Sequence, residues 1–318
     1  MRNGGVICIC QAPAVSALVS IKPELRSWIE SNLDRGCPPE QLIAGMIERR
    51  FDPPIAQGLV RAFVDARNAG VPLTGDSVRI DTPAATYGNE APRIPAGSSI
   101  RTADRIVSVV ARLSRPIIAV LANVLSAEEC AQLIALARPR LRPSTVVDPA
   151  TGENRVAGYR NSDSMFFRPA ETPLIATLDA RFSEIMNLPI DHGEGLQVLR
   201  YAPDPNGTSQ FTPHFDFLVP RNAASVESLR RSGQRVSSLV MYLNDVPGGG
   251  ETTFPHAGLS VCPRRGNAVY FEYCNSRGQV DAASVHAGAP VTAGEKWAMT
   301  KWMRERRFIP APQPDSRT

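Results

Sequence analysis

The sequence predicts an α+β protein in which a small all-α helical module precedes a larger domain rich in short strands. Apolar residues recur at helical spacing through residues 21–70. Residues 71–102 lack periodicity and are interrupted by Pro and Gly, which is typical of a linker. Residues 103–310 contain two helical segments and then many short apolar runs, the pattern of a β-sandwich or barrel buttressed by helices.

Length and composition exclude several classes of protein. A chain of 318 residues has room for about two domains. Its 35 basic and 31 acidic side chains leave a formal charge of 35 − 31 = +4, which is too balanced for a polyanion binder, so we expect no nucleic-acid partner. No apolar run approaches the roughly 18 residues of a membrane span, so we expect no membrane association.

The six cysteines favour a reducing, cytoplasmic compartment. They include one C-x-C and no C-x-x-C, and they are sparser than in a disulfide-stapled secreted domain. The apolar run near the N-terminus is broken by Gln11 and Pro13. Residues 1–20 are therefore predicted to be disordered rather than an export signal, and residues 311–318 are predicted to be a tail.

The predicted helical module consists of three short amphipathic segments. Pro and Gly interrupt the helical pattern at residues 36–39 and 52–54. A bundle of about fifty residues is compatible with peptide or protein binding. It is equally compatible with a packing or dimerisation appendage, and the sequence leaves both open.

The elements of the larger domain are predicted in chain order. Residues 116–121 form a short apolar strand, and Ser126-x-x-Glu129 is a capping box that opens a helix ending near Ala137. Apolar residues at helical spacing predict a second helix over residues 174–186, with Pro189 just beyond its end. Strands are then predicted at residues 196–201, 236–243, 267–273, 289–291 and 296–303.

The chemistry is predicted from a few spaced residues. His214 and Asp216 form an H-x-D motif in a run that can be extended, so both side chains would point to one face. His286 follows after several predicted strands, so the chain can return beside the first. Two imidazoles and one carboxylate on one face form the facial triad of non-haem Fe(II) oxygenases, which leaves positions open for oxygen and a co-substrate.

Lys296 lies 296 − 286 = 10 residues after His286, a spacing that allows a turn into an adjacent antiparallel strand. Its ammonium would then lie in the cavity of the triad, a few ångströms from the metal. Fe(II) and Asp216 together carry +1, and a 2-oxoglutarate dianion lowers this charge to −1. Lys296 then restores the neutrality that a buried site favours, so the grouping predicts a dianionic co-substrate.

Alternatives to this set remain open at the level of single residues. A bare H-x-D motif also occurs in surface strands and in satisfied polar pairs. His256, in a turn rich in Gly and Pro, is a rival ligand, and His192, in the turn over residues 189–195, is a weaker one.

Longer segments around these residues resemble a known family. The segments are STVVDPATGE at residues 144–153, LQVLRY at 196–201, PHFDF at 213–217, GQRVSSLVMYLNDVPGGGETTFP at 233–255, PRRGNAVYF at 263–271 and SVHAGAPVTAGEKWAMTKWMRER at 284–306. Together they resemble the prolyl 4-hydroxylase family of Fe(II)/2-oxoglutarate-dependent dioxygenases over roughly residues 115–307. The resemblance implies a double-stranded β-helix, or jelly roll, flanked by helices.

The resemblance also implies roles for individual residues. His214, Asp216 and His286 match the iron ligands, and Lys296 matches the base that binds the distal carboxylate of 2-oxoglutarate. Tyr201 and Tyr242 match phenols that contact the co-substrate, although either could be an ordinary half-buried strand residue. The implied cofactors are Fe(2+), 2-oxoglutarate and L-ascorbate.

The resemblance implies a peptidyl-proline 4-hydroxylase-like dioxygenase acting on a peptide or protein. Two alternatives stay open: hydroxylation of another protein residue or a small molecule, and a non-catalytic jelly-roll binding protein with an N-terminal interaction module. Phe211 stands where many relatives have Tyr, and residues 204–210 form a longer connection than usual, which puts substrate choice more than iron binding in doubt. The sequence does not predict the oligomeric state.

Overall fold

The structure is a computed structural model that describes residues 15–49, 51, 53–82, 87–147, 154–156, 162–203, 210–220 and 222–311. The chain divides into two compact units, Met1–Tyr87 and Gly88–Thr318. The boundary therefore lies within the predicted linker and about fifteen residues before its expected end at residue 102. None of the described helices combines the length and apolar character needed to cross a membrane.

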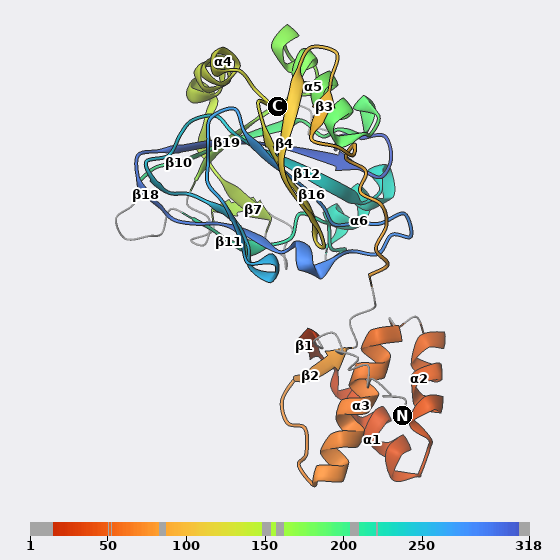
Figure 1. Cartoon of the computed structure of the whole chain (residues 1–318). Coiled ribbons are helices and arrows are strands. Elements are labelled where there is room, and N and C mark those ends of the chain that lie inside the picture. Colours follow the sequence, from red (N-terminus) through yellow and green to blue (C-terminus); the bar gives the residue numbers. More distant parts are fainter. Residues whose placement is uncertain are drawn as a thin grey trace, which may run out of the picture. The chain divides into compact units, whose positions relative to one another are not determined.

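The N-terminal unit contains the three predicted helices and an unpredicted pair of strands (Figure 1). The helices are α1 (Pro23–Asp34), α2 (Pro39–Glu48) and α3 (Pro53–Ala69), and the antiparallel strands are β1 (Val15–Ser20) and β2 (Ser77–Thr82). The all-α prediction is thus incomplete, because β1 lies in the segment predicted to be disordered and β2 in the predicted linker. Val78 and Ile80 of β2 are buried in the helical core, a two-residue alternation too short to stand out in the sequence. Residues 1–14 and 312–318 lie outside the described residues.

Two antiparallel sheets of the second unit form a jelly roll, as predicted. The larger has nine strands in the order β3 (Ser99–Arg101), β4 (Ile106–Ser114), β5 (Ile117–Ala122), β16 (Ala268–Glu272), β12 (Arg235–Tyr242), β19 (Lys296–Arg304), β10 (Leu196–Tyr201), β9 (Asp163–Phe167) and β6 (Arg142–Pro143). The smaller has the order β11 (Phe211–His214), β17 (His286–Gly288), β14 (Thr252–Phe254) and β15 (Leu259–Val261). Two-strand pairs join β13 (Gly248–Gly249) to β18 (Val291–Ala293) and β7 (Thr145–Val147) to β8 (Asn154–Val156).

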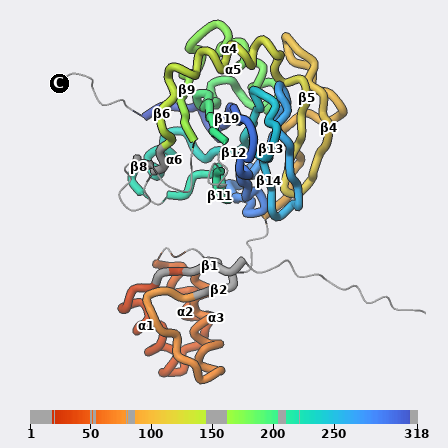
Figure 2. Tube along the Cα trace, turned by 90° about the vertical axis from the view of Figure 1, so that its left-hand side faces the viewer, coloured from red at the N-terminus to blue at the C-terminus, as the bar shows by residue number. Residues whose placement is uncertain are grey.

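The helices α4 (Ala127–Ala137) and α5 (Pro173–Met186) lie on the same side of the larger sheet (Figures 1 and 2). Side chains alternate between the two faces of each strand, so one face of β19 meets α5 and the other faces the smaller sheet. Lys301 on the helix side donates a 2.7 Å hydrogen bond to Asp179 of α5. Lys296, Thr300 and Trp302 on the other side line a cavity. The larger sheet thus separates a helix-covered core from the cavity.

Several predicted elements of this unit are confirmed to within a residue or two. The capping box is formed, since Ser126 accepts a bond from the Glu129 amide and the Glu129 carboxylate accepts one from the Ser126 amide. The strand predicted over residues 289–291 instead begins at Val291, after Pro290. One further helix, α6 (Ala223–Ser232), was not predicted; its N-cap is Asn222.

The four cysteines within the described residues, Cys37, Cys130, Cys262 and Cys274, are free thiols. Cys130 and Cys274 are buried, and burial raises the pKa of each to about 11. These two thiols are therefore packed as small apolar side chains.

Candidate active site

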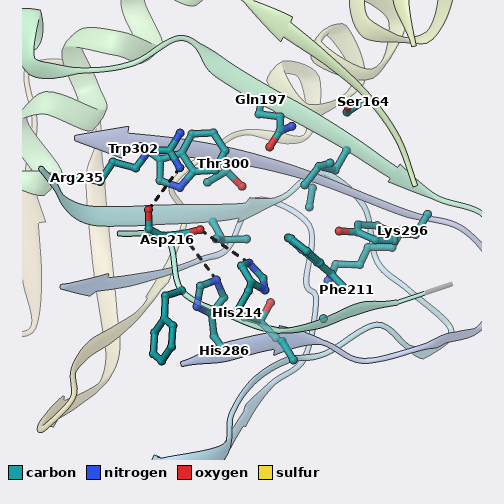
Figure 3. A pocket seen from close by; sticks show the side chains of 18 of the residues that line it. Ser164, Gln197, Phe211, His214, Asp216, Arg235, His286, Lys296, Thr300 and Trp302 are labelled. Carbon is teal, nitrogen blue, oxygen red and sulfur yellow. Dashed lines mark hydrogen bonds and ion pairs between the residues drawn. The ribbon is translucent and has the colours of Figure 1, made fainter. Parts of the chain in front are cut away.

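A cavity of about 480 Å³ lies between the two sheets (Figure 3). Strands β10, β12 and β19 of the larger sheet line one side of it, and β11, β14 and β17 of the smaller sheet line the other. This arrangement lets residues far apart in the chain point into one space. All three residues of the predicted triad, and Lys296, are among its lining residues.

The smaller sheet brings the triad together. His214 ends β11 and His286 begins β17, and the two are cross-strand partners with ring centroids 4.3 Å apart. The Asp216 carboxylate oxygens lie 3.8 Å from Nε2 of His214 and 3.7 Å from Nε2 of His286. The three donor atoms all lie within 4.8 Å of one another. The convergence of Asp216 with His214 does not come from a shared strand face, however, because β11 ends at His214 and Asp216 lies in the bend that follows.

Backbone carbonyls fix the orientation of both imidazoles. Nδ1 of His214 lies 2.8 Å from the carbonyl of Thr212, and Nδ1 of His286 lies 3.2 Å from the carbonyl of Ser284. A carbonyl only accepts, so each Nδ1 carries a proton, and Nε2 is the nitrogen of each ring that faces Asp216. Outer partners of this kind are typical of metal-binding histidines.

Asp216 is held as a carboxylate. Burial alone would raise its pKa, but His286, His214 and Arg235 together with a hydrogen bond from Ser238 hold the pKa below its usual value. The Ser238 hydroxyl donates to Oδ2 at 2.6 Å. Two imidazoles and an ionised carboxylate are the donor set of Fe(II) oxygenases, and an iron(II) ion binding at the two Nε2 atoms would take the place of any proton there, so these residues fit the ion.

Lys296 reaches the cavity from the opposite sheet. The prediction of an adjacent antiparallel strand is wrong, because β17 belongs to the smaller sheet and β19 to the larger. The chain instead crosses from one sheet to the other between His286 and Lys296. Lys296 is 4% exposed, and within the described part of the chain it makes no hydrogen bond or ion pair, although the charge of Glu251 attracts it from farther away. Burial lowers its pKa to about 8.

Comparisons with known proteins agree with this geometry. The profile of the 2OG-Fe(II) oxygenase superfamily matches residues 196–304. Prolyl 4-hydroxylase 1 of Arabidopsis thaliana is 41% identical over 206 residues, which cover 60% of this chain and 70% of that protein. Probable prolyl 4-hydroxylase 3 of the same organism is 38% identical over 200 residues, covering 57% and 67%. The chain belongs to the prolyl 4-hydroxylase family. It is a 2-oxoglutarate-dependent dioxygenase.

Solved structures of similar proteins include a viral collagen prolyl hydroxylase from Paramecium Bursaria Chlorella virus-1 in complex with 2OG. It is 26% identical, with a TM-score of 0.46, and the match covers 59% of this chain and 95% of that one. A prolyl-4-hydroxylase from Pseudomonas putida is 20% identical with a TM-score of 0.40, and the match covers 59% and 92%.

Tyr201 and Tyr242, the two predicted tyrosines, lie beside Lys296. Tyr201 is its cross-strand partner, and the Lys296 Nζ lies 5.5 Å from the Tyr201 ring centroid and 5.7 Å from that of Tyr242. The Tyr242 hydroxyl donates a 2.8 Å hydrogen bond to Thr252 of the smaller sheet. Thr252 lines the cavity and was not predicted, because no spacing distinguishes it from Thr253.

Arg235 and Trp302 form the end of the cavity opposite Lys296 (Figure 3). Neither residue was singled out from the sequence. The guanidinium lies 4.1 Å from the Trp302 ring centroid and binds both oxygens of Glu194, at 2.7 and 2.8 Å. These contacts fix a flat aromatic and cationic wall next to Asp216.

The rival histidines lie outside this site. His256 is exposed on the short 3-10 turn Pro255–Ala257. His192 points its Nδ1 at the carbonyl of Arg304, 3.1 Å away. Neither is among the residues that line the cavity.

Proposed function

We propose that this chain hydroxylates proline residues in peptides or proteins. In this proposal His214, Asp216 and His286 hold Fe(II), and Lys296 binds the distal carboxylate of 2-oxoglutarate. One observation carries the proposal: a buried ammonium without a hydrogen-bond or ion-pair partner among the described residues shares a cavity with two imidazoles and a carboxylate that converge.

The surroundings of Lys296 favour a carboxylate ligand. An isolated buried ammonium is costly unless an anion accompanies it. Thr252 accepts its bond from Tyr242, so its own hydroxyl proton can be donated to a bound carboxylate. Tyr201 flanks the ammonium from the larger sheet. Lys296, Thr252 and Tyr201 therefore provide charge, a donor and a phenol for one carboxylate group.

When bound, iron and 2-oxoglutarate supply the oxidation: O2, 2-oxoglutarate and a substrate C–H group give succinate, CO2 and an alcohol. The chain's residues orient the participants. The backbone-anchored His214 and His286 would offer their Nε2 atoms to the ion in fixed orientations, and the cavity between the sheets limits access of water. The wall formed by Arg235 and Trp302 would place the substrate next to the triad.

The rim of the cavity supports a proline-containing substrate. Phe166 is 52% exposed and Phe215 is 41% exposed, although both line the cavity. Aromatic side chains bind proline-rich segments because such segments are already extended and lose little entropy on binding. The relatives named prolyl 4-hydroxylases support the same substrate class.

The test is direct. The purified full chain is incubated with Fe(II), 2-oxoglutarate, ascorbate and a panel of proline-containing peptides, and products are located by mass spectrometry. We expect one added oxygen on proline, together with an equivalent of succinate. Oxygen on another residue would overturn the proline assignment, and no succinate with any peptide would overturn the enzymatic role of this site. The His286→Ala chain is the control for reaction without the chain's metal site.

Two further parts of the proposal concern conditions rather than geometry. We propose ascorbate as the reductant that keeps the iron in its Fe(II) state. We also propose a reducing, cytoplasmic compartment, which the four free thiols Cys37, Cys130, Cys262 and Cys274 support. Omission of ascorbate should shorten the period of linear turnover without changing the initial rate.

A further inference from the structure

A chain of two hydroxyl groups ends on Asp216. The Ser238 hydroxyl donates to Oδ2 of Asp216 at 2.6 Å, and the Tyr273 hydroxyl lies 3.1 Å from the same Ser238 oxygen. Ser238 and Tyr273 are 0% exposed. The contacts therefore form within the protein interior, where such bonds are strong and costly to leave unmade.

The two hydrogen bonds that link Tyr273, Ser238 and Asp216 can have only one donor–acceptor order. A serine hydroxyl has one proton, and Ser238 gives it to Asp216. Tyr273 must therefore donate to Ser238. The order Tyr273, Ser238, Asp216 polarises each bond toward the carboxylate, because the last acceptor carries the negative charge.

The two oxygens of Asp216 are otherwise nearly equivalent toward a metal. Oδ1 lies 3.8 Å from Nε2 of His214, and Oδ2 lies 3.7 Å from Nε2 of His286. A carboxylate in this position could bind a metal through one oxygen or through both. Binding through both would occupy an additional coordination position, which the reaction needs for oxygen.

We propose that Ser238 and Tyr273 are positioning residues that hold Oδ2 away from the metal, so that Asp216 binds through Oδ1 alone. This inference rests on the proposed ligand set. The hydrogen bond occupies a lone pair of Oδ2 and fixes the rotation of the carboxylate. The open coordination position thus depends on two hydroxyl groups that do not touch the metal.

Neighbouring aromatic rings hold the Tyr273 side chain, and with it the pair of hydroxyl groups, in place. The Tyr273 ring contacts the rings of Phe217 and Phe271, with centroid distances of 6.3 and 5.8 Å. Phe271 also packs on His286, at 4.6 Å. Because Ser238 comes from β12 of the larger sheet, its bond to Asp216 also ties that sheet to the bend that follows β11.

The chain offers a matched set of variants. Ser237 is the adjacent residue of β12, is equally buried and points to the opposite face, so Ser237→Ala controls for the loss of a buried hydroxyl. Ser238→Thr and Ser238→Val have the same shape and differ only in the hydroxyl, and Tyr273→Phe removes only the outer donor. The probe is Co(II), whose absorption spectrum reports coordination number and whose affinity is measured by competition with a chelator.

We expect Ser238→Val to bind Co(II) about tenfold or more weakly than Ser238→Thr, with weaker absorption bands typical of a higher coordination number. Tyr273→Phe should shift the spectrum in the same direction by less, and Ser237→Ala should match the unmodified chain. Equal affinity and spectra for Ser238→Val and Ser238→Thr would overturn the inference. Failure of the proposed ligand set is separate: it would appear as Co(II) binding that survives His214→Ala.

Discussion

His214 and His286 face each other across β11 and β17, with their ring centroids 4.3 Å apart and each Nδ1 bonded to a backbone carbonyl two residues earlier. Antiparallel pairing of two short strands that are far apart in the sequence thus places two imidazoles with equivalent roles side by side. The same carbonyl contact on both fixes the tautomer that a metal ligand needs.

Loss of either imidazole should remove metal binding. We expect His286→Ala to weaken Fe(II) binding by more than the roughly 10–100-fold that loss of an outer partner costs. Anaerobic calorimetry measures this affinity. His256→Ala is the matched control, because His256 is exposed and lies outside the cavity, and it should bind Fe(II) like the unmodified chain. Equal loss in both variants would contradict the assignment.

Removal of the buried ammonium should affect the co-substrate selectively. Lys296→Ala leaves a bound carboxylate without its charged partner, which costs about 2–5 kcal/mol, or at least roughly 30-fold in apparent KM for 2-oxoglutarate. Fe(II) affinity should be unchanged. Succinate production over a 2-oxoglutarate titration measures the effect, and an unaltered titration would reject the role of Lys296.

The pH dependence of co-substrate binding follows from the lowered pKa of Lys296. Its pKa is about 8 in the free chain, so the ammonium is present below this pH and is lost above it. We expect the apparent KM for 2-oxoglutarate to rise roughly tenfold per pH unit above about pH 8. Lys296→Arg keeps its charge, so its KM should stay flat over the same range, and a matching rise in that variant would point to another group.

The free energy of unfolding should also depend on Lys296, but a rise in pH that weakens co-substrate binding should increase the stability of the fold. The pKa of Lys296 lies below the roughly 10.4 of an unfolded lysine, so between these values the unfolded chain binds more protons. The contribution of Lys296 to the free energy of unfolding therefore rises with pH across this window. Urea titrations of the unmodified chain and of Lys296→Met at pH 8 and pH 10 test this, since the difference between the two chains should change with pH.

The aromatic rim should matter for the peptide alone. Phe166→Ala is expected to raise the peptide KM roughly 2- to 10-fold, the loss of an aromatic contact, without changing the KM for 2-oxoglutarate. Ile190→Ala is the control, because Ile190 is also 52% exposed but lies outside the cavity. Similar peptide KM values for the two variants would show that the rim does not contact the substrate.

Local signals predicted much of the fold. The capping box of Ser126 and Glu129 and the apolar run of β10 are patterns of residues close together in the sequence. Both elements lie where they were predicted. Helix α6 was missed although Asn222 and Gly233 mark its ends, because few apolar residues lie between them. Strand β2 was missed because its place is set by packing on α3 and by pairing with β1, which lies at the opposite end of the unit's sequence.

The site was predicted in part for the wrong geometric reason. The H-x-D motif and a distant histidine do converge, but Asp216 arrives through a bend and Lys296 through a crossing between sheets. Arg235, Ser238 and Thr252 were not singled out as site residues, because their roles depend on which face of a strand meets the cavity. That choice depends on register and sheet order, which are long-range properties of the fold.

The triad belongs to the four-stranded sheet, and Lys296 belongs to the nine-stranded sheet that faces it. Packed sheets stand about 10 Å apart, a distance set by the side chains between them. The distance between the two sheets therefore sets the length of the ligand. A dicarboxylate that binds the metal with one end and the Lys296 ammonium with the other must match this distance. A dicarboxylate that is one methylene shorter or longer than 2-oxoglutarate would lose one of these two contacts. Selectivity for a five-carbon co-substrate would then be a property of the whole architecture, and repacking between the sheets could alter it without any change to the residues that touch the ligand.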